Sequence, residues 1–179
     1  MRRYPIIILA GGEKGPLYDT TGYAEKAKIP IHGRAMLEWV IDAYHACPRA
    51  GDLVVVGSAH LDALPAMAHV RKRVFEGISL VQNLLHAITY VKHRLYGSAS
   101  EHDGYVISFC DAVFLTPEII DATLRTIDAA DADLVLHYVD RQAFEDANLP
   151  AKRTYLPVGD HQLTGSTIYY VRRFRKVIS

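Results

Sequence analysis

The 179 residues predict an α/β protein with a mostly parallel sheet and helices on both faces. Strand-like and helix-like segments alternate along most of the chain. Two of the strand-like segments, Tyr4–Ala10 and Leu53–Gly57, lack polar alternation, which is typical of parallel strands that are buried on both faces. Apolar residues make up 50% of the chain, enough to fill one core. We therefore expect a single domain over residues 1–179.

The first third of the chain contributes two strands and two helices. Tyr4–Ala10 and Leu53–Gly57 are apolar runs without polar alternation, and we expect buried strands there. Met36–Cys47 is expected to be a helix because four apolar residues share one stripe: Leu37, Val40, Ile41 and Tyr44. Asp62–Val70 is expected to form a further helix.

The middle of the chain repeats the alternation. We expect a short strand at Arg73–Phe75, a long helix at Ser79–Leu95 and a buried strand at Tyr105–Phe109. The next helix is expected to begin after Thr116, because Thr suits the N-cap and Pro117 the first helical position. It should end near residue 130.

The last part of the chain is less regular. Leu134–Val139 reads as a further apolar strand, and beyond it we expect strands at Arg153–Pro157 and Thr167–Val171. No internal repeat or linker is visible. Elements in this order predict helices on both sides of a sheet, with ligands binding outside the carboxyl ends of the strands.

Composition excludes several classes of partner. Twenty basic and twenty acidic residues cancel, so no electrostatic footprint for nucleic acid or an anionic membrane is visible. No apolar run approaches the ~18 residues of a membrane span, and the run near the N-terminus is too short for a signal peptide. Two cysteines, Cys47 and Cys110, do not make a disulfide framework. We expect a cytoplasmic protein.

Two adjacent glycines, Gly11 and Gly12, end the first strand. They allow a sharp turn and leave bare backbone for a ligand, although an ordinary strand-to-loop turn explains them equally well. The dinucleotide fingerprint needs glycines at relative positions 1, 3 and 6, and the glycines here fall at 11, 12 and 15. This spacing argues against an NAD-type oxidoreductase. The Gly-Lys of a P-loop is also missing.

A loop of roughly twenty residues follows, and loops of that length in a compact domain are usually functional. Leu9–Gly12 (LAGG), this loop and Lys26–Leu37 (KAKIPIHGRAML) together resemble the opening of nucleotidyltransferases of the molybdenum-cofactor guanylyltransferase-like superfamily. Cys110–Glu118 (CDAVFLTPE) resembles the family's Asp-x-Pro segment, and Thr164–Thr167 (TGST) resembles its Thr-Gly-Gly-Asn. The resemblance implies a three-layer α/β/α, Rossmann-like fold of the glycosyltransferase-A-like type.

The resemblance also implies an activity. A nucleoside triphosphate is attacked at its α-phosphorus by a small-molecule acceptor, usually phosphorylated, and pyrophosphate is released. Lys26 and Asp111 are the implied catalytic residues, with Asp111 as the ligand of Mg²⁺. The implied nucleotide-binding residues are Leu9, Ala10, Gly11, Gly12, Lys26, Gly77, Ser79 and Asn83. The implied acceptor-binding residues are Thr164, Gly165, Ser166 and Thr167.

Each of these side chains also has an ordinary structural explanation. Lys26 taken alone is a solvated loop lysine, and Asp111 can cap the loop before the helix that follows it. Ser79 is a good N-cap, and Asn83 suits a helix surface. A carboxylate next to a strand as apolar as Tyr105–Phe109 is nevertheless costly to bury unless a cation or donors meet it.

The sequence departs from the family pattern at several points. No arginine lies between residues 12 and 17, Val113 replaces a proline, and Ser166-Thr167 replaces Gly-Asn. Relatives usually continue through further helices beyond the position of Ser179, which leaves open a domain truncated at its C-terminus. The alternative function is therefore a catalytically impaired nucleotide-binding module. The nucleobase and the acceptor are not specified, and a homo-oligomer stays open.

Overall fold

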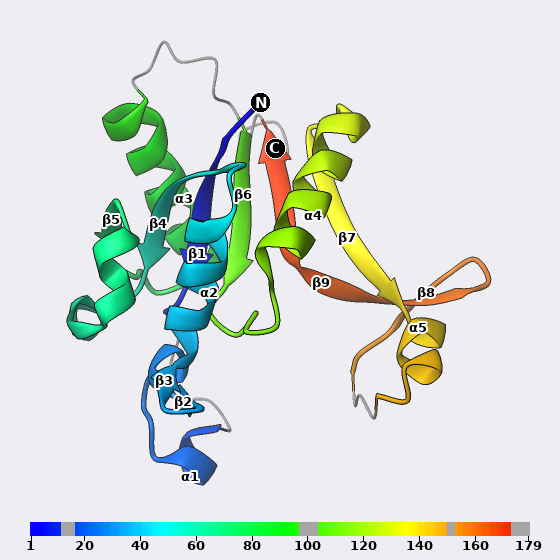
Figure 1. Ribbon diagram of the computed structural model, residues 1–179, viewed down its shortest axis with the longest axis horizontal. Coiled ribbons are helices and arrows are strands. Elements are labelled where there is room, and N and C mark those ends of the chain that lie inside the picture. The colour runs from blue at the N-terminus through cyan, green and yellow to red at the C-terminus, as the bar shows by residue number, and fades with distance from the viewer. Residues whose placement is uncertain (12–16, 97–103, 150–152, 173–179) are drawn as a thin grey trace.

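The computed structural model describes residues 1–11, 17–96, 104–149 and 153–172 (Figure 1). Within these residues a seven-stranded sheet has the order β5-β4-β1-β6-β9-β7, with β8 paired to β9. Its strands are β1 (Tyr4–Leu9), β4 (Ala50–Val56), β5 (Lys72–Val74), β6 (Gly104–Phe109), β7 (Leu134–Asp140), β8 (Leu156–Val158) and β9 (His161–Arg172). A separate two-stranded ribbon consists of β2 (Pro30–Ile31) and β3 (Arg34–Ala35).

The sheet is mostly parallel, as predicted. β1 pairs in parallel with β4 and β6, and β4 pairs in parallel with β5. Only β9 runs against its neighbours β6, β7 and β8 among the strands of this sheet that the structure describes. Leu9 lies opposite both Val56 and Phe109, so the carboxyl ends of the three central strands are level.

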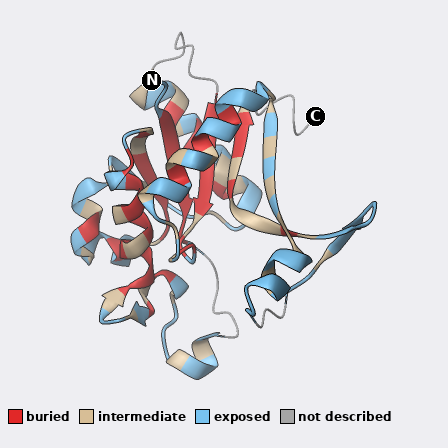
Figure 2. Cartoon of the chain, turned by 45° about the vertical axis from the view of Figure 1, so that its right-hand side comes forward, coloured by how far each residue is buried: buried red, intermediate tan, exposed pale blue. Residues whose placement is uncertain are grey.

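Helices cover both faces of the sheet and complete the predicted three layers (Figure 1). α2 (Met36–Ala46) and α4 (Pro117–Ala130) lie on one face, and α3 (Leu80–Tyr90) lies on the other. Alternate residues of β1 enter the two cores: Ile6 and Ile8 pack with α2 and α4, and Ile7 packs with α3. All of β1 is buried, which explains why its sequence lacks polar alternation (Figure 2).

The predicted helix at Asp62–Val70 is wrong. The structure has two short 3-10 helices instead, η2 (Ala59–Ala63) and η3 (Pro65–His69), joined at Leu64 with a ψ of 131°. Pro65 explains the break, because a residue before proline is disfavoured in the helical region and shifts to the extended one.

Other predicted boundaries need smaller corrections. β8 begins at Leu156, so Arg153–Tyr155 is irregular rather than part of a strand. The long N-terminal loop contains two short elements, α1 (Leu17–Thr21) and η1 (Lys26–Lys28). α3 continues into the π-helical turn η4 (Val91–Leu95), and the unpredicted helix α5 (Arg141–Asp146) follows β7. No helix in the described part of the chain has the length and apolar character needed to cross a bilayer.

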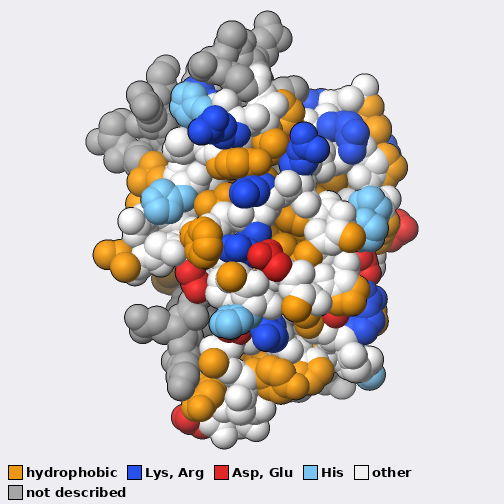
Figure 3. All heavy atoms as spheres, turned by 90° about the vertical axis from the view of Figure 1, so that its left-hand side faces the viewer, with side chains coloured by type: hydrophobic (Ala, Val, Ile, Leu, Met, Phe, Trp, Pro, Cys, Tyr) orange, Lys and Arg blue, Asp and Glu red, His pale blue; other side chains and the backbone are white. Residues whose placement is uncertain are grey.

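The β5 edge of the sheet carries charged side chains, several of which lie on the face shown in Figure 3. Lys72 and Arg73 belong to β5, and Arg71 precedes it. Arg73 Nε donates to Asp62 Oδ1 at 2.8 Å, and its Nη1 donates to the carbonyl of Gly57 at 3.2 Å. Charges on an edge strand disfavour pairing with a second chain. The basic cluster is therefore explained by edge protection.

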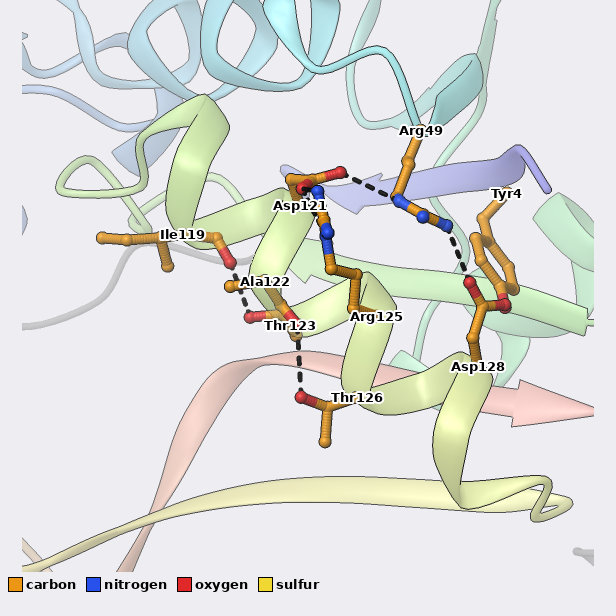
Figure 4. Close-up of polar contacts among 9 residues, drawn as sticks. All are labelled: Tyr4, Arg49, Ile119, Asp121, Ala122, Thr123, Arg125, Thr126 and Asp128. Carbon is orange, nitrogen blue, oxygen red and sulfur yellow. Dashed lines mark hydrogen bonds and ion pairs between the residues drawn. The ribbon is translucent and has the colours of Figure 1, made fainter. Parts of the chain in front are cut away.

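Arg49 connects the segment before β4 to helix α4 (Figure 4). Its guanidinium lies 2.9 Å from Asp121 Oδ1 and 2.7 Å from Asp128 Oδ2, and its side chain is only 17% exposed. The hydroxyl of Tyr4 also donates to Asp128. One arginine thus neutralises two partly buried carboxylates.

We expect Arg49→Met to lower the free energy of unfolding by about 2 kcal/mol, because it leaves Asp121 and Asp128 without their shared cation. Urea unfolding measures the change. Arg125→Met is the matched control, because Arg125 also pairs with Asp121 but is 68% exposed, and it should cost less than about 0.5 kcal/mol. Equal losses in the two variants would contradict the prediction.

Candidate active site

Four loops meet at one edge of the sheet, because β1, β4, β5 and β6 are parallel and end side by side. Backbone hydrogen bonds of 2.8–3.0 Å connect them just beyond the strand ends: Ala10 N to Val56 O, Gly57 N to Val74 O and Cys110 N to Leu9 O. Gly11 and Asp111 therefore lie at the same edge, as the sequence predicts.

Lys26 and Asp111 form an ion pair at this edge. The lysine comes from η1 and the aspartate follows β6, so they are 85 residues apart in sequence. Lys26 Nζ donates to Asp111 Oδ2, and the two side chains are 46% and 38% exposed. Asp111 Oδ1 accepts no hydrogen bond from the residues that the structure describes. The fold thus brings together the cation and the carboxylate that the resemblance singles out.

The helix after Asp111 does not need that carboxylate as its cap. The Thr116 hydroxyl accepts from Ile119 N at 3.3 Å, as the sequence predicts for the N-cap of α4. The Asp111 carboxylate faces Lys26 instead. The Asp111 side chain is 38% exposed rather than buried, and Lys26 supplies its counter-charge.

Gly11 has a neighbour that sequence reasoning missed. A Cβ at this position would run into the side chain of Glu76, whose own Cβ would be 3.0 Å away. The glycine therefore lets Glu76 lie directly against the backbone after β1. Gly12 lies outside the described residues. Glu76 follows β5 in sequence, but no spacing rule links it to Gly11.

A second acidic side chain, Glu25, also lies next to this edge. Its Oε1 accepts from the Ser58 hydroxyl at 2.9 Å, just beyond β4. Its Oε2 is buried and has no hydrogen-bond partner among the described residues. Glu25, Glu76 and Asp111 thus all lie along this edge of the sheet, and of the three Asp111 pairs with Lys26 in the described part of the chain. Such a site repels a free triphosphate unless a cation neutralises it.

Three of the predicted nucleotide-binding residues, Gly77, Ser79 and Asn83, make contacts within their own segment. The Ser79 hydroxyl accepts from Gln82 N at 3.2 Å and caps α3. Asn83 is buried rather than on the helix surface, and its Oδ1 accepts from the backbone N–H of Gly77. These contacts shape residues 76–79 beside Gly11. A direct contact of Gly77, Ser79 or Asn83 with a nucleotide stays a prediction.

The predicted acceptor residues Thr164, Gly165, Ser166 and Thr167 are consecutive in β9. Pairing of β9 with β6 ends at Ile168 opposite Ser108. The segment 164–167 therefore continues beyond the carboxyl end of β6, on the side where Asp111 lies. It pairs there with β7, and Thr164 is buried opposite Val139. A role of this segment in acceptor binding stays a prediction.

Cys110 precedes the aspartate but is unsuited to nucleophilic chemistry. Burial and, to a smaller extent, the neighbouring Asp111 raise the pKa of its thiol to about 12, and Lys26 acts weakly in the opposite sense. The thiol is therefore neutral at physiological pH. Cys47 and Cys110 are both free and buried.

Comparisons with known proteins identify the family and the fold. A family model described as a MobA-like NTP transferase domain matches residues 6–177. A hypothetical transferase from Thermus thermophilus is 28% identical, with a TM-score of 0.76 over 99% of this chain and 69% of that one. No curated protein matches.

Two further solved structures have the same fold at lower identity. The 4-diphosphocytidyl-2C-methyl-D-erythritol synthase from Anaerococcus prevotii is 14% identical, with a TM-score of 0.61 over 99% of this chain and 72% of that one. A CMP:2-keto-3-deoxy-manno-octonic acid synthetase, solved with CTP, is 13% identical, with a TM-score of 0.58 over 97% and 75%. These two likenesses show the fold alone. Because the family model matches nearly the whole chain, the protein belongs to the MobA-like NTP transferase domain family and is a nucleotidyltransferase.

Proposed function

We propose that the chain transfers a nucleoside monophosphate from a nucleoside triphosphate to a small-molecule acceptor that carries a phosphate, in a Mg²⁺-dependent reaction that releases pyrophosphate. The observation that carries this proposal is the pairing of Lys26 with Asp111 at the carboxyl edge of the sheet, beside Gly11. The names of the two synthase and synthetase relatives, one of them solved with CTP, support a cytidylyl donor as one option.

The reaction asks mainly for charge neutralisation and positioning. An acceptor oxygen forms a bond to the α-phosphorus, and the bond from that phosphorus to the β-phosphate oxygen breaks. Lys26 would offset the charge on the phosphoryl oxygens, and the backbone at Gly11 would offer N–H groups. The segment 164–167 would contact the acceptor. The neutral Cys110 thiol agrees with direct transfer without a covalent enzyme intermediate.

The residues present fit Mg²⁺. This ion usually keeps several waters and binds one or two carboxylates together with substrate phosphates. Asp111 offers one partly exposed carboxylate whose Oδ1 is free of protein donors in the described ranges. No cluster of three acidic, histidine or cysteine ligands occurs in those ranges, which suits an ion held largely by substrate. When bound, Mg²⁺ would neutralise phosphate charge next to Asp111.

A nucleotide-binding module with impaired catalysis is the second candidate. Ser166 and Thr167 stand in β9 where one branch of the family has Gly-Asn, and this change supports the second candidate. Pyrophosphate release with a panel of sugar and polyol phosphates separates the two candidates. A pure binder would show nucleotide affinity without turnover.

Thermal unfolding with ATP, CTP, GTP and UTP tests the proposal. At 100 times its dissociation constant a ligand adds about 2.7 kcal/mol of stability. At roughly 2–4 °C per kcal/mol for a chain of this size, one nucleotide with Mg²⁺ should raise Tm by about 5–10 °C. Asp111→Ala should remove the Mg²⁺-dependent part, whereas Asp42→Ala, which breaks the pair with Arg34, should keep it. Absence of any shift would contradict the proposed function.

A further inference from the structure

Lys26 and Asp111 have different ligands in the proposed reaction, yet in the ligand-free chain they bind each other. We propose that this ion pair is a latch, in which the Lys26 ammonium, bound to Asp111 Oδ2, repels a divalent metal from the same carboxylate. Metal and triphosphate then bind cooperatively, because each takes one partner of the pair and frees the other. This inference rests on the proposed function and adds a regulation of the same site.

The geometry makes Lys26 and the metal competitors. Lys26 Nζ donates to Asp111 Oδ2, and Mg²⁺ needs its ligand oxygens at about 2.0–2.1 Å. An ammonium hydrogen bonded to the same carboxylate therefore crowds and repels the ion. Among the described residues no other cation contacts Asp111.

Lys26 has no ion pair with the other carboxylates of the edge, Glu25 and Glu76, in the described part of the chain. Glu25 accepts from Ser58, and Glu76 lies against Gly11. A lysine displaced by metal therefore has a bound triphosphate as its natural counter-charge. Conversely, a triphosphate that takes Lys26 leaves an unpaired carboxylate beside its own negative charges, and a metal relieves that repulsion.

The exposure of the ion pair limits how strongly Lys26 can weaken metal binding. The two side chains are 46% and 38% exposed, and an exposed ion pair contributes at most about 1 kcal/mol of interaction free energy. Since 1.4 kcal/mol corresponds to a tenfold change, removing the lysine should tighten metal binding by about two- to fivefold. Thermodynamic linkage makes the coupling reciprocal. The nucleotide raises the metal affinity, and the metal raises the nucleotide affinity by the same factor.

Binding of Mn²⁺ alone, measured by electron paramagnetic resonance of the free ion, tests the latch without turnover. Lys26→Met should bind Mn²⁺ about two- to fivefold more tightly than the wild-type chain, and Asp111→Asn should lose this site. Lys28→Met is the matched control, because Lys28 lies on the same short helix η1 and has no ion pair with Asp111 in the described residues. The change in Mn²⁺ affinity caused by Lys28→Met should be well below that caused by Lys26→Met.

Inorganic tripolyphosphate in the presence of EDTA gives the converse measurement. Asp111→Asn should bind it about two- to fivefold more tightly than the wild-type chain, because Lys26 is then free and a repulsive carboxylate is gone. Circular dichroism confirms that each variant is folded.

Three results would overturn the latch: Mn²⁺ affinity in Lys26→Met no higher than in Lys28→Met, no Mn²⁺ binding by Lys26→Met at all, or unchanged tripolyphosphate affinity in Asp111→Asn. The proposed function fails by a different measurement, namely when no nucleotide with Mg²⁺ stabilises the wild-type chain.

Discussion

Replacing Asp111 by asparagine is expected to lower the rate of pyrophosphate release by about 10²–10³-fold, measured with the nucleotide and acceptor that the wild-type chain uses. The amide keeps the size of the side chain but removes the charge that holds Mg²⁺ in the proposed reaction. Removal of one preorganised electrostatic partner of a transition state typically costs this much. Lys26 keeps its charge, so nucleotide affinity without metal should not fall.

The control for this variant is Asp42→Asn. Asp42 pairs with Arg34, and both members of that pair are 41% exposed, similar to Asp111 and Lys26. A general effect of losing an exposed ion pair would appear in both variants. A rate within about threefold of wild type in Asp111→Asn would show that Asp111 does not hold the metal during the reaction.

The elements of the fold were largely predictable because local rules decide them. β1 and β6 are buried on both faces and so carry no polar alternation. Thr116 and Pro117 specify the start of α4 by their own capping chemistry. The broken helix before β5 was missed although its signal, Pro65, is visible in the sequence.

Contacts within the site were harder to predict because they join distant segments. The parallel order of β1 and β6 implied that Gly11 and Asp111 share an edge, and this was correct. The position of Glu76 against Gly11 depends on where β5 ends, which no local pattern specifies. The reversal of β9 also depends on which neighbours it pairs with rather than on its own residues.

Sequence reasoning drew attention to the glycines after β1, whereas the structure identifies Gly51, in β4, as a glycine with a strict steric requirement. A Cβ there would lie 2.8 Å from the carbonyl oxygen of Tyr4 and 3.3 Å from Pro5 N. The pairing of β1 with β4 shifts register at this point. Pro5 has no N–H to donate to the ladder, and β4 accommodates it by bringing bare backbone close.

Gly51→Ala is therefore expected to lower the free energy of unfolding by about 2–3 kcal/mol, as overpacking against backbone does. Urea unfolding measures the loss. Gly77→Ala is the control, because its added Cβ would meet the side chain of Gln82, which can move, and it should cost less than about 1 kcal/mol. Equal small losses of unfolding free energy in both variants would mean that β1 moves to make room for the new methyl group without loss of stability. The larger loss at Gly51 would instead show that β1, which leads to Gly11, is held against β4 in one close-packed arrangement.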